Sequence, residues 1–256
     1  MKTALFFCLV ILFFFQTSCK KNPSYVEGCA AFDGVEILTN SPVTIGEKMH
    51  IYAPEIGGRR IYTWTGPDNY TLGKNGETED SIVHVELKNE GWYYLALSRD
   101  DCPVVKLDSV YFDVKLKQGT PACSTTTNSC YYSNLSDDSY SIIKKSINPT
   151  YNVLTLSANG VGNMNILFHP AWKNTEPEDG IYITNSAEFF DQTDRNYNKV
   201  YVTTTKQSIY WGSQPNQQVF VSHINGKLQV RFCNLAMSGS NGTSFVTSAT
   251  ANIVQQ

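Results

Sequence analysis

Residues 225–233 read Asn-Gly-Lys-Leu-Gln-Val-Arg-Phe-Cys, an Asn-Gly pair followed by an alternating segment. Asn-Gly between two apolar segments is typical of a β-hairpin, because a type I′ turn needs positive φ at both central positions. After the pair, Leu228, Val230 and Phe232 occupy every second position, so they share one face of a strand and Cys233 lies on the other. The stretch therefore predicts a hairpin whose second strand has one apolar row.

The same pattern of short alternating segments, separated by Gly, Asn, Asp and Pro, extends over most of the chain. In the first half, strands are predicted at 35–38, 48–53, 61–64, 82–87, 92–98 and 109–115. In the second half, they are predicted at 141–145, 153–157, 163–168, 180–184, 199–204, 218–223, 227–233 and 244–253. No segment has the periodicity of an amphipathic helix of three turns. Short strands with frequent turn residues are typical of sandwiches and barrels, so we expect an all-β fold.

A polar stretch at 118–128 (QGTPACSTTTN) divides the chain. It contains Gly, Pro and a cluster of Ser, Thr and Asn, a composition typical of an interdomain linker. On either side we expect a β-sandwich domain, the first at 29–117 and the second at 123–256, which begins at Cys123 within the linker. Both lengths are normal for a domain.

The N-terminus has the three parts of an export signal. Met1-Lys2-Thr3 is basic, residues 4–15 (ALFFCLVILFFF) are all apolar, and small residues precede Cys19. The apolar run is shorter than the roughly 20 residues that a membrane-spanning helix needs. The segment resembles a bacterial lipoprotein signal, which implies a signal peptide at 1–18, acylation of Cys19 and a lipidated tether at 19–28. An ordinary signal cleaved near Ser18 and an uncleaved anchor are the alternatives.

The expected partners follow from this anchor and from the charge. The lipoprotein resemblance implies a place in the cell envelope, lipid-anchored at the outer membrane of a Gram-negative cell, with the membrane as one partner. The formal net charge is −3 and no basic stripe is present, so nucleic acid is not expected as a partner.

Two motifs of the first domain carry a family resemblance. They are the stretch 62–71 (YTWTGPDNYT) and the stretch 89–93 (NEGWY), followed by Cys102. Together they resemble the immunoglobulin-like, PKD-type modules of secreted and surface bacterial proteins, although the Trp-Asp-Phe-Gly-Asp-Gly segment of that type is missing. The resemblance implies a core Trp64, a Tyr93 that bonds back to the backbone at a tyrosine corner, and a role as spacer or interaction domain.

The second domain is similar to the β-rich C-terminal domains of uncharacterised Gram-negative lipoproteins. The similarity rests on 123–128, on Gly-Ile-Tyr at 180–182, on Val-Phe-Val at 219–221 and on 226–234. It implies no activity.

Cysteines of an exported chain are free to pair. Because the first and last strands of a sandwich run close together, we expect a Cys29–Cys102 disulfide in the first domain, with two free thiols as the alternative. In the second domain we expect Cys123–Cys233, with Cys130 as the alternative partner, so one thiol is left over.

Catalytic motifs are not recognisable. His50, His84, His169 and His223 each stand alone, and neither a nucleophile elbow nor a phosphate-binding or dinucleotide-binding loop occurs. We therefore expect no cofactor and no catalysis, and an unrecognised hydrolase is the second alternative. Its paired carboxylates would come from Glu176, Glu178, Asp179, Asp191 and Asp194.

Two local patterns remain as candidate binding sites. Asp191, Asp194, Asn196 and Asn198 supply alternating oxygen ligands and make a weak calcium candidate, although no metal is expected overall. Aromatic residues near predicted loops also suit binding of a glycan or a protein, and Tyr210-Trp211 is the first place to look. The function expected from all of this is a non-catalytic envelope lipoprotein acting as an interaction or spacer module, with a carbohydrate-binding lipoprotein as the alternative.

Overall fold

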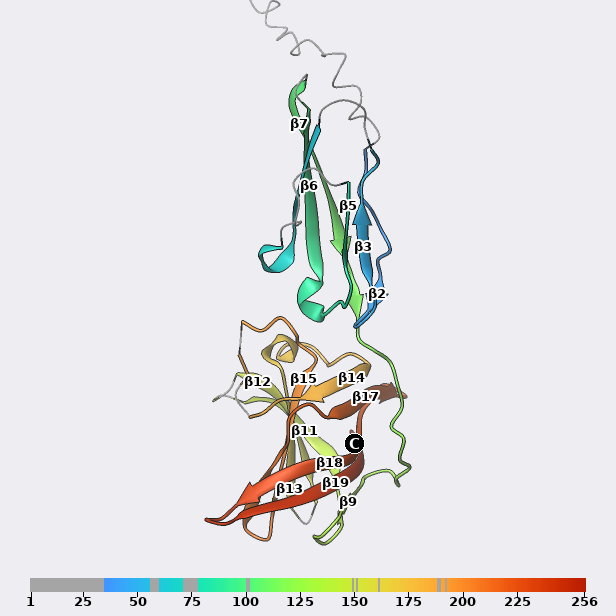
Figure 1. Cartoon of the computed structure of the whole chain (residues 1–256). Helices are drawn as coiled ribbons and strands as arrows, with labels where there is room; N and C mark the ends of the chain where they lie inside the picture. The colour runs from blue at the N-terminus through green and yellow to red at the C-terminus, as the bar shows by residue number, and fades with distance from the viewer. Residues whose placement is uncertain are drawn as a thin grey trace, which may run out of the picture.

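The computed structural model describes residues 35–55, 60–70, 78–99, 102–148, 150, 152–160, 162–187, 190–191 and 193–256. The predicted signal peptide, the tether, Cys19 and Cys29 lie outside these ranges. Within them the chain is built of β-strands and short 3₁₀ helices, and no helix there has the length and hydropathy needed to cross a membrane. Figure 1 shows two bodies stacked end to end and joined by an extended segment.

The first domain is a sandwich of two three-stranded antiparallel sheets, β1-β3-β5 and β4-β6-β7, with a parallel pair, β2-β8, beside them. The strands are β1 (Leu38–Thr39), β2 (Val43–Thr44), β3 (Met49–Tyr52), β4 (Arg60–Thr65), β5 (Glu79–Ile82), β6 (Gly91–Arg99), β7 (Cys102–Phe112) and β8 (Val114–Lys115). Trp64 and Leu95 are buried in its core. The predicted immunoglobulin-like sandwich is therefore confirmed.

The two sequence motifs of this domain pack against each other. The hydroxyl of Tyr93 donates to the backbone oxygen of Asn89 at 2.9 Å, which is the predicted tyrosine corner. A Cβ on Gly66 would lie 2.7 Å from the Tyr93 ring, and a Cβ on Gly91, whose φ is +140°, would lie 2.9 Å from Pro67. Each motif thus needs its glycine because the other motif approaches so closely.

Two predicted strands of this domain, 35–38 and 82–87, are wrong. Residues 35–37 form no strand, and β1 begins only at Leu38. β5 ends at Ile82, and the chain then turns into a 3₁₀ helix, η3 (Leu87–Asn89). Val85 and Leu87 are buried, as in a strand, but Val85 bonds only to the loop residues Gly46 and Glu47, at 2.8 and 3.0 Å. At 82–87 the alternation of apolar and polar residues therefore belongs to a buried loop and not to a strand.

The second domain is formed by one 11-stranded sheet of order β10-β9-β19-β18-β17-β14-β15-β13-β12-β11, with β16 pairing with both β15 and β18. Its strands are β9 (Ser129–Tyr132), β10 (Asp138–Ser139), β11 (Ser141–Asn148), β12 (Val153–Asn159), β13 (Asn163–Phe168), β14 (Gly180–Thr184), β15 (Lys199–Lys206), β16 (Ile209–Ser213), β17 (Gln218–Ile224), β18 (Lys227–Ser240) and β19 (Ser244–Val254).

This sheet folds back on itself. β16 bridges two strands that are not neighbours along the path, and Gln256 N donates to Ile142 O of β11 at 3.2 Å. The enclosed face forms the core, which includes Met164, Ile166, Phe168, Val202, Val230, Phe232 and Met237. Two layers of strands therefore enclose one apolar interior, which keeps the domain within the predicted all-β sandwich class.

The hairpin between β17 and β18 confirms the turn read from Asn-Gly. Asn225 has φ 52° and Gly226 has φ 76°, so both central residues are left-handed as a type I′ turn requires. Leu228, Val230 and Phe232 are buried.

Cys233, on the opposite face of β18, forms a disulfide with Cys123, and the two Cα atoms lie 5.8 Å apart. The bond fixes the middle of the linker to the sheet. Cys130, the alternative partner, is a free buried thiol whose pKa is raised by burial to about 12, so it stays protonated and unreactive. The Cys29–Cys102 bridge stays a prediction, because Cys29 lies outside the described residues.

Candidate functional site

Among the side chains that the structure describes on the β4-β6-β7 sheet, none that points to the outer face is charged. Side chains on these strands alternate between the core and this face. The outward positions, which we call the uncharged face, are Ile61, Thr63, Thr65, Trp92, Tyr94, Ala96, Ser98, Val105, Leu107, Ser109 and Tyr111.

Six large apolar side chains stand exposed on the uncharged face. Leu107 is 72% exposed, and the rings of Trp92 and Tyr94 are each about half exposed. Trp92 lies opposite Tyr111 in the register, and their rings meet edge to face, 5.6 Å apart at 74°. Contiguous exposed apolar surface of this kind marks interaction sites on soluble proteins, and depletion of charge with enrichment of Trp and Tyr is typical of interface cores.

The aromatic pair predicted from the sequence is only half right. Tyr210 is 46% exposed, as expected. Trp211 is 2% exposed, which corrects the expectation that its ring faces solvent. The reason is that the residues around it form β16 between β15 and β18, and the indole N–H donates to Lys206 O at 3.4 Å inside the domain.

A second candidate region is the junction between the domains, which centres on Glu90. The carboxylate of Glu90 accepts hydrogen bonds from the hydroxyls of Tyr111, at 2.6 Å, and Tyr197. Its backbone oxygen accepts from the Arg195 guanidinium at 2.6 Å. The bond to Glu90 is the main cause that raises the pKa of Tyr111 to about 12. Because these groups come from both domains, specific hydrogen bonds hold the two domains together at the junction.

Beside Glu90 the junction encloses an open cavity of about 480 Å³. Its lining comes from both domains and includes Tyr111, His169, Lys173, Asp194 and Arg195. Cavities at domain interfaces are common ligand sites. The charged groups in the lining are of both signs, so the cavity does not point to one class of ligand.

Replacing Glu90 with alanine is expected to loosen the junction, because it removes the acceptor of two hydroxyls. Small-angle scattering should show a wider range of domain orientations. Hydrogen exchange should rise at the amide of Lys88, which donates across the junction to Asn196. Glu79→Ala, on β5 away from the junction, is the control. Equal scattering and exchange in the two variants would contradict this role of Glu90.

His169 lies buried at the edge of this cavity as a neutral ring. Its Nδ1 accepts from the Ala171 amide at 3.2 Å, so Nε2 carries the proton toward Asp191 O at 3.4 Å. Burial lowers the pKa of His169 below the usual value of about 6.5.

Because the folded state resists protonation of His169, stability should fall as the pH drops below about 6.5, by at most about 1.4 kcal/mol per pH unit for one proton. The contribution of the neutral His169 to stability is fully present above the unfolded-state pKa, and it is lost as the pH falls toward the folded-state pKa. Denaturant unfolding at pH 7 and pH 5 measures it. In His169→Gln this part of the slope should vanish, and an unchanged slope would refute the assignment.

The loop of the calcium candidate is explained by other contacts. Asp191 Oδ1 accepts from Thr193 N at 2.8 Å, and Asp194 Oδ1 accepts from Asn196 N at 2.8 Å. Asn196 binds Lys88 and Glu86 of the first domain, and Asn198 lines a separate small hollow. Across the described ranges, no group of three or more His, Cys, Asp or Glu is placed to hold a metal ion. The oxygen-bearing side chains of this loop therefore stabilise turns and contact the first domain at the junction.

Two carboxylates considered for hydrolysis meet at His223. Glu176 lies 3.3 Å from its Nε2 and Asp179 lies 2.5 Å from its Nδ1. Lys145 pairs with Glu176 as well. The ring stands between the two carboxylates and all four groups are partly exposed, so they form a surface ion-pair cluster, not a pair facing each other across a cleft.

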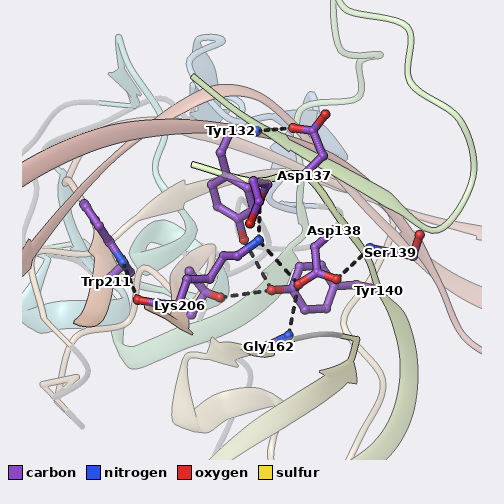
Figure 2. Close-up of polar contacts among 10 residues, drawn as sticks. Tyr132, Asp137, Asp138, Ser139, Tyr140, Gly162, Lys206 and Trp211 are labelled. Atoms are coloured by element: carbon purple, nitrogen blue, oxygen red, sulfur yellow. Dashed lines mark hydrogen bonds and ion pairs between the residues drawn. The ribbon is translucent and has the colours of Figure 1, made fainter. Parts of the chain in front are cut away.

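A buried polar cluster occupies the far end of the second domain (Figure 2). The side chains of Lys206 and Asp138 are 4% and 0% exposed, and Nζ lies 3.5 Å from Oδ2. Nζ also donates to Ser136 O and stands 4.6 Å from the centre of the Tyr132 ring. The Asp138 carboxylate accepts from two backbone amides, Ser139 at 2.9 Å and Gly162 at 3.0 Å. Its donors and acceptors are satisfied, which indicates a structural role.

Fold and surface define an all-β chain with an immunoglobulin-like sandwich, a second β-sandwich domain and an uncharged exposed face. No protein-family model matches the chain, and no curated protein matches it. Solved structures with similar strand arrangements include a chimeric titin Z1Z2 tandem (10% identity, TM-score 0.24, 84% of this chain and 93% of that one). Another is Sidekick-1 immunoglobulin domains 1–5 (10% identity, TM-score 0.25, 87% of this chain and 59% of that one). A third is the structure of the eight N-terminal Ig domains of Down Syndrome Cell Adhesion Molecule (10% identity, TM-score 0.24, 87% of this chain and 23% of that one). At these TM-scores the likeness adds no argument about function.

Proposed function

We propose that this protein is a non-catalytic, lipid-anchored cell-envelope protein that binds a protein partner through the uncharged face of its first domain. The observation that carries the proposal is the composition of that face, where six large apolar side chains stand in solvent with no charge among them. Leaving such a surface bare costs free energy that covering it recovers, at roughly 25 cal/mol per Å².

The chemistry of the face favours a protein over a glycan. Sugar sites combine aromatic stacking with polar groups that fix the ligand's orientation. Here the rings of Trp92 and Tyr94 share the face with aliphatic side chains such as Leu107, and the outward side chains named above include hydroxyls but no amide, carboxylate or guanidinium. Carbohydrate binding remains the second candidate because the exposed rings are present.

Photo-crosslinking in the host tests the proposal. A photoreactive amino acid in place of Tyr94 should give light-dependent adducts of discrete mass. The same group in place of Tyr210, which is similarly exposed on the second domain, should give none. Equal labelling from both positions would refute a binding role for the face. If the protein instead binds envelope polysaccharide, and Trp92→Ala abolishes that binding, the partner of this face is a glycan and not a protein.

The anchor is tested separately. We expect the mature chain to begin at Cys19 and to carry acyl mass there, because the N-terminal segment has a basic start, a short apolar run and a cysteine after small residues. Mass spectrometry of the N-terminal peptide decides this, with Cys19→Ala as the unlipidated control. A native chain that begins at Met1, or one without acyl mass, would contradict the lipoprotein assignment.

A further inference from the structure

Large and small side chains alternate in two rows of the uncharged face, whereas the large rings of Trp92 and Tyr111 stand side by side. Tyr94 stands between Thr65 and Ser109 in one row, and Leu107 stands beside Ala96 in the next. Sheets that pack face to face interdigitate side chains with this kind of relief. These rows therefore have the relief of a sheet that packs against another sheet.

We propose that the sheet it packs against is the same face of a second copy of this chain. The inference rests on the proposed function and names its partner. Because none of the outward side chains is charged, two copies meet without like-charge repulsion and without burying an unpaired charge. Different proteins usually select each other by complementary charge, and this face supplies none.

The dimensions of the face limit the size of a two-fold contact. β6 has nine residues and so runs about 30 Å, and three strands about 5 Å apart give a width of about 15 Å. These dimensions give a footprint of about 450 Å², short of the roughly 800 Å² that each partner gives to a standard interface, so we expect the two-fold contact to be small and the dimer to be weak.

The orientation of the strands suits a two-fold contact. β6 and β7 run along the long axis of the molecule, so the face points sideways (Figure 1). A two-fold axis parallel to that long axis places both chains with the same end toward the membrane, and it makes the contact isologous.

Sedimentation equilibrium of the purified full chain, in detergent of matched density, tests the inference. We expect a monomer–dimer equilibrium. Leu107→Asp should weaken it about tenfold or more, since a two-fold contact buries both introduced charges. Val246→Asp is the matched control, because Val246 is 71% exposed on the second domain against 72% for Leu107, and it should leave the dimer unchanged. Circular dichroism confirms that both variants fold.

Each outcome of this experiment either supports or overturns the inference. A dimer lost in Leu107→Asp and kept in Val246→Asp supports the second copy. A chain that stays monomeric, or a dimer indifferent to Leu107→Asp, overturns it. If the chain is monomeric while the Tyr94 position still crosslinks to another protein in cells, the inference fails and the proposed function stands. If neither association occurs, both fail.

Discussion

Removing the Cys123–Cys233 disulfide, by serine at both positions, is expected to lower the free energy of unfolding of the second domain by about 4 to 5 kcal/mol. The two residues are 110 apart in the chain, and a cross-link that closes a loop of that length restricts the unfolded chain strongly. The bond also holds the middle of the linker on β18, where Cys123 N lies 3.1 Å from Cys233 Sγ. Denaturant unfolding followed with and without reductant measures the effect.

The control is Cys130→Ala. Cys130 is buried and free, so this variant should keep the full response to reductant that the native chain shows. A native chain whose unfolding midpoint ignores reductant would show that the bond does not form or does not stabilise.

Replacing Lys206 with methionine should cost about 3 to 5 kcal/mol. The change leaves the Asp138 carboxylate buried without its cation, and breaking a buried pair from one side is far costlier than removing both charges. Adding Asp138→Asn should recover part of the loss, because no charge is then buried, although the single amide oxygen can replace only one of the two carboxylate oxygens that accept from Ser139 and Gly162.

Lys145→Met serves as the comparison for Lys206. Lys145 also pairs with a carboxylate, but at the surface, and such pairs contribute about 1 kcal/mol or less. If the two lysine variants lose equal stability, or if the double variant is no better than Lys206→Met alone, the buried pair does not have the role assigned to it.

Periodicity was informative where one face of a strand is polar. The predicted bounds 163–168 and 180–184 coincide with β13 and β14, and the turn at 225–226 has the predicted φ values. Short elements such as β2 and β10 have too few residues to show a period, and β16 was missed because its aromatic pair looked like the start of a loop.

The uncharged face escaped the sequence analysis for a physical reason. In β6, Trp92 and Tyr94 alternate with Tyr93 and Leu95, so both faces of the strand are apolar and alternation cannot say which one is buried. Only the tyrosine corner at Tyr93 shows which side chains of β6 point into the core, and the remaining side chains must then point outward. A strand with large apolar side chains on both faces is the signal that points to such a surface. The junction was equally hidden, because Glu90 and Tyr197 lie 107 residues apart.

Radical footprinting of the protein in its native envelope tests the central claim most directly. We predict that oxidation of Trp92, Tyr94 and Leu107 is strongly suppressed in intact envelopes compared with the purified chain at high dilution, while oxidation of exposed Tyr210 and Val246 is the same in both. Equal oxidation of Trp92 and Tyr94 in the two preparations would mean that nothing covers the uncharged face in the cell, and the account of this protein as a binding module acting through that face would be wrong.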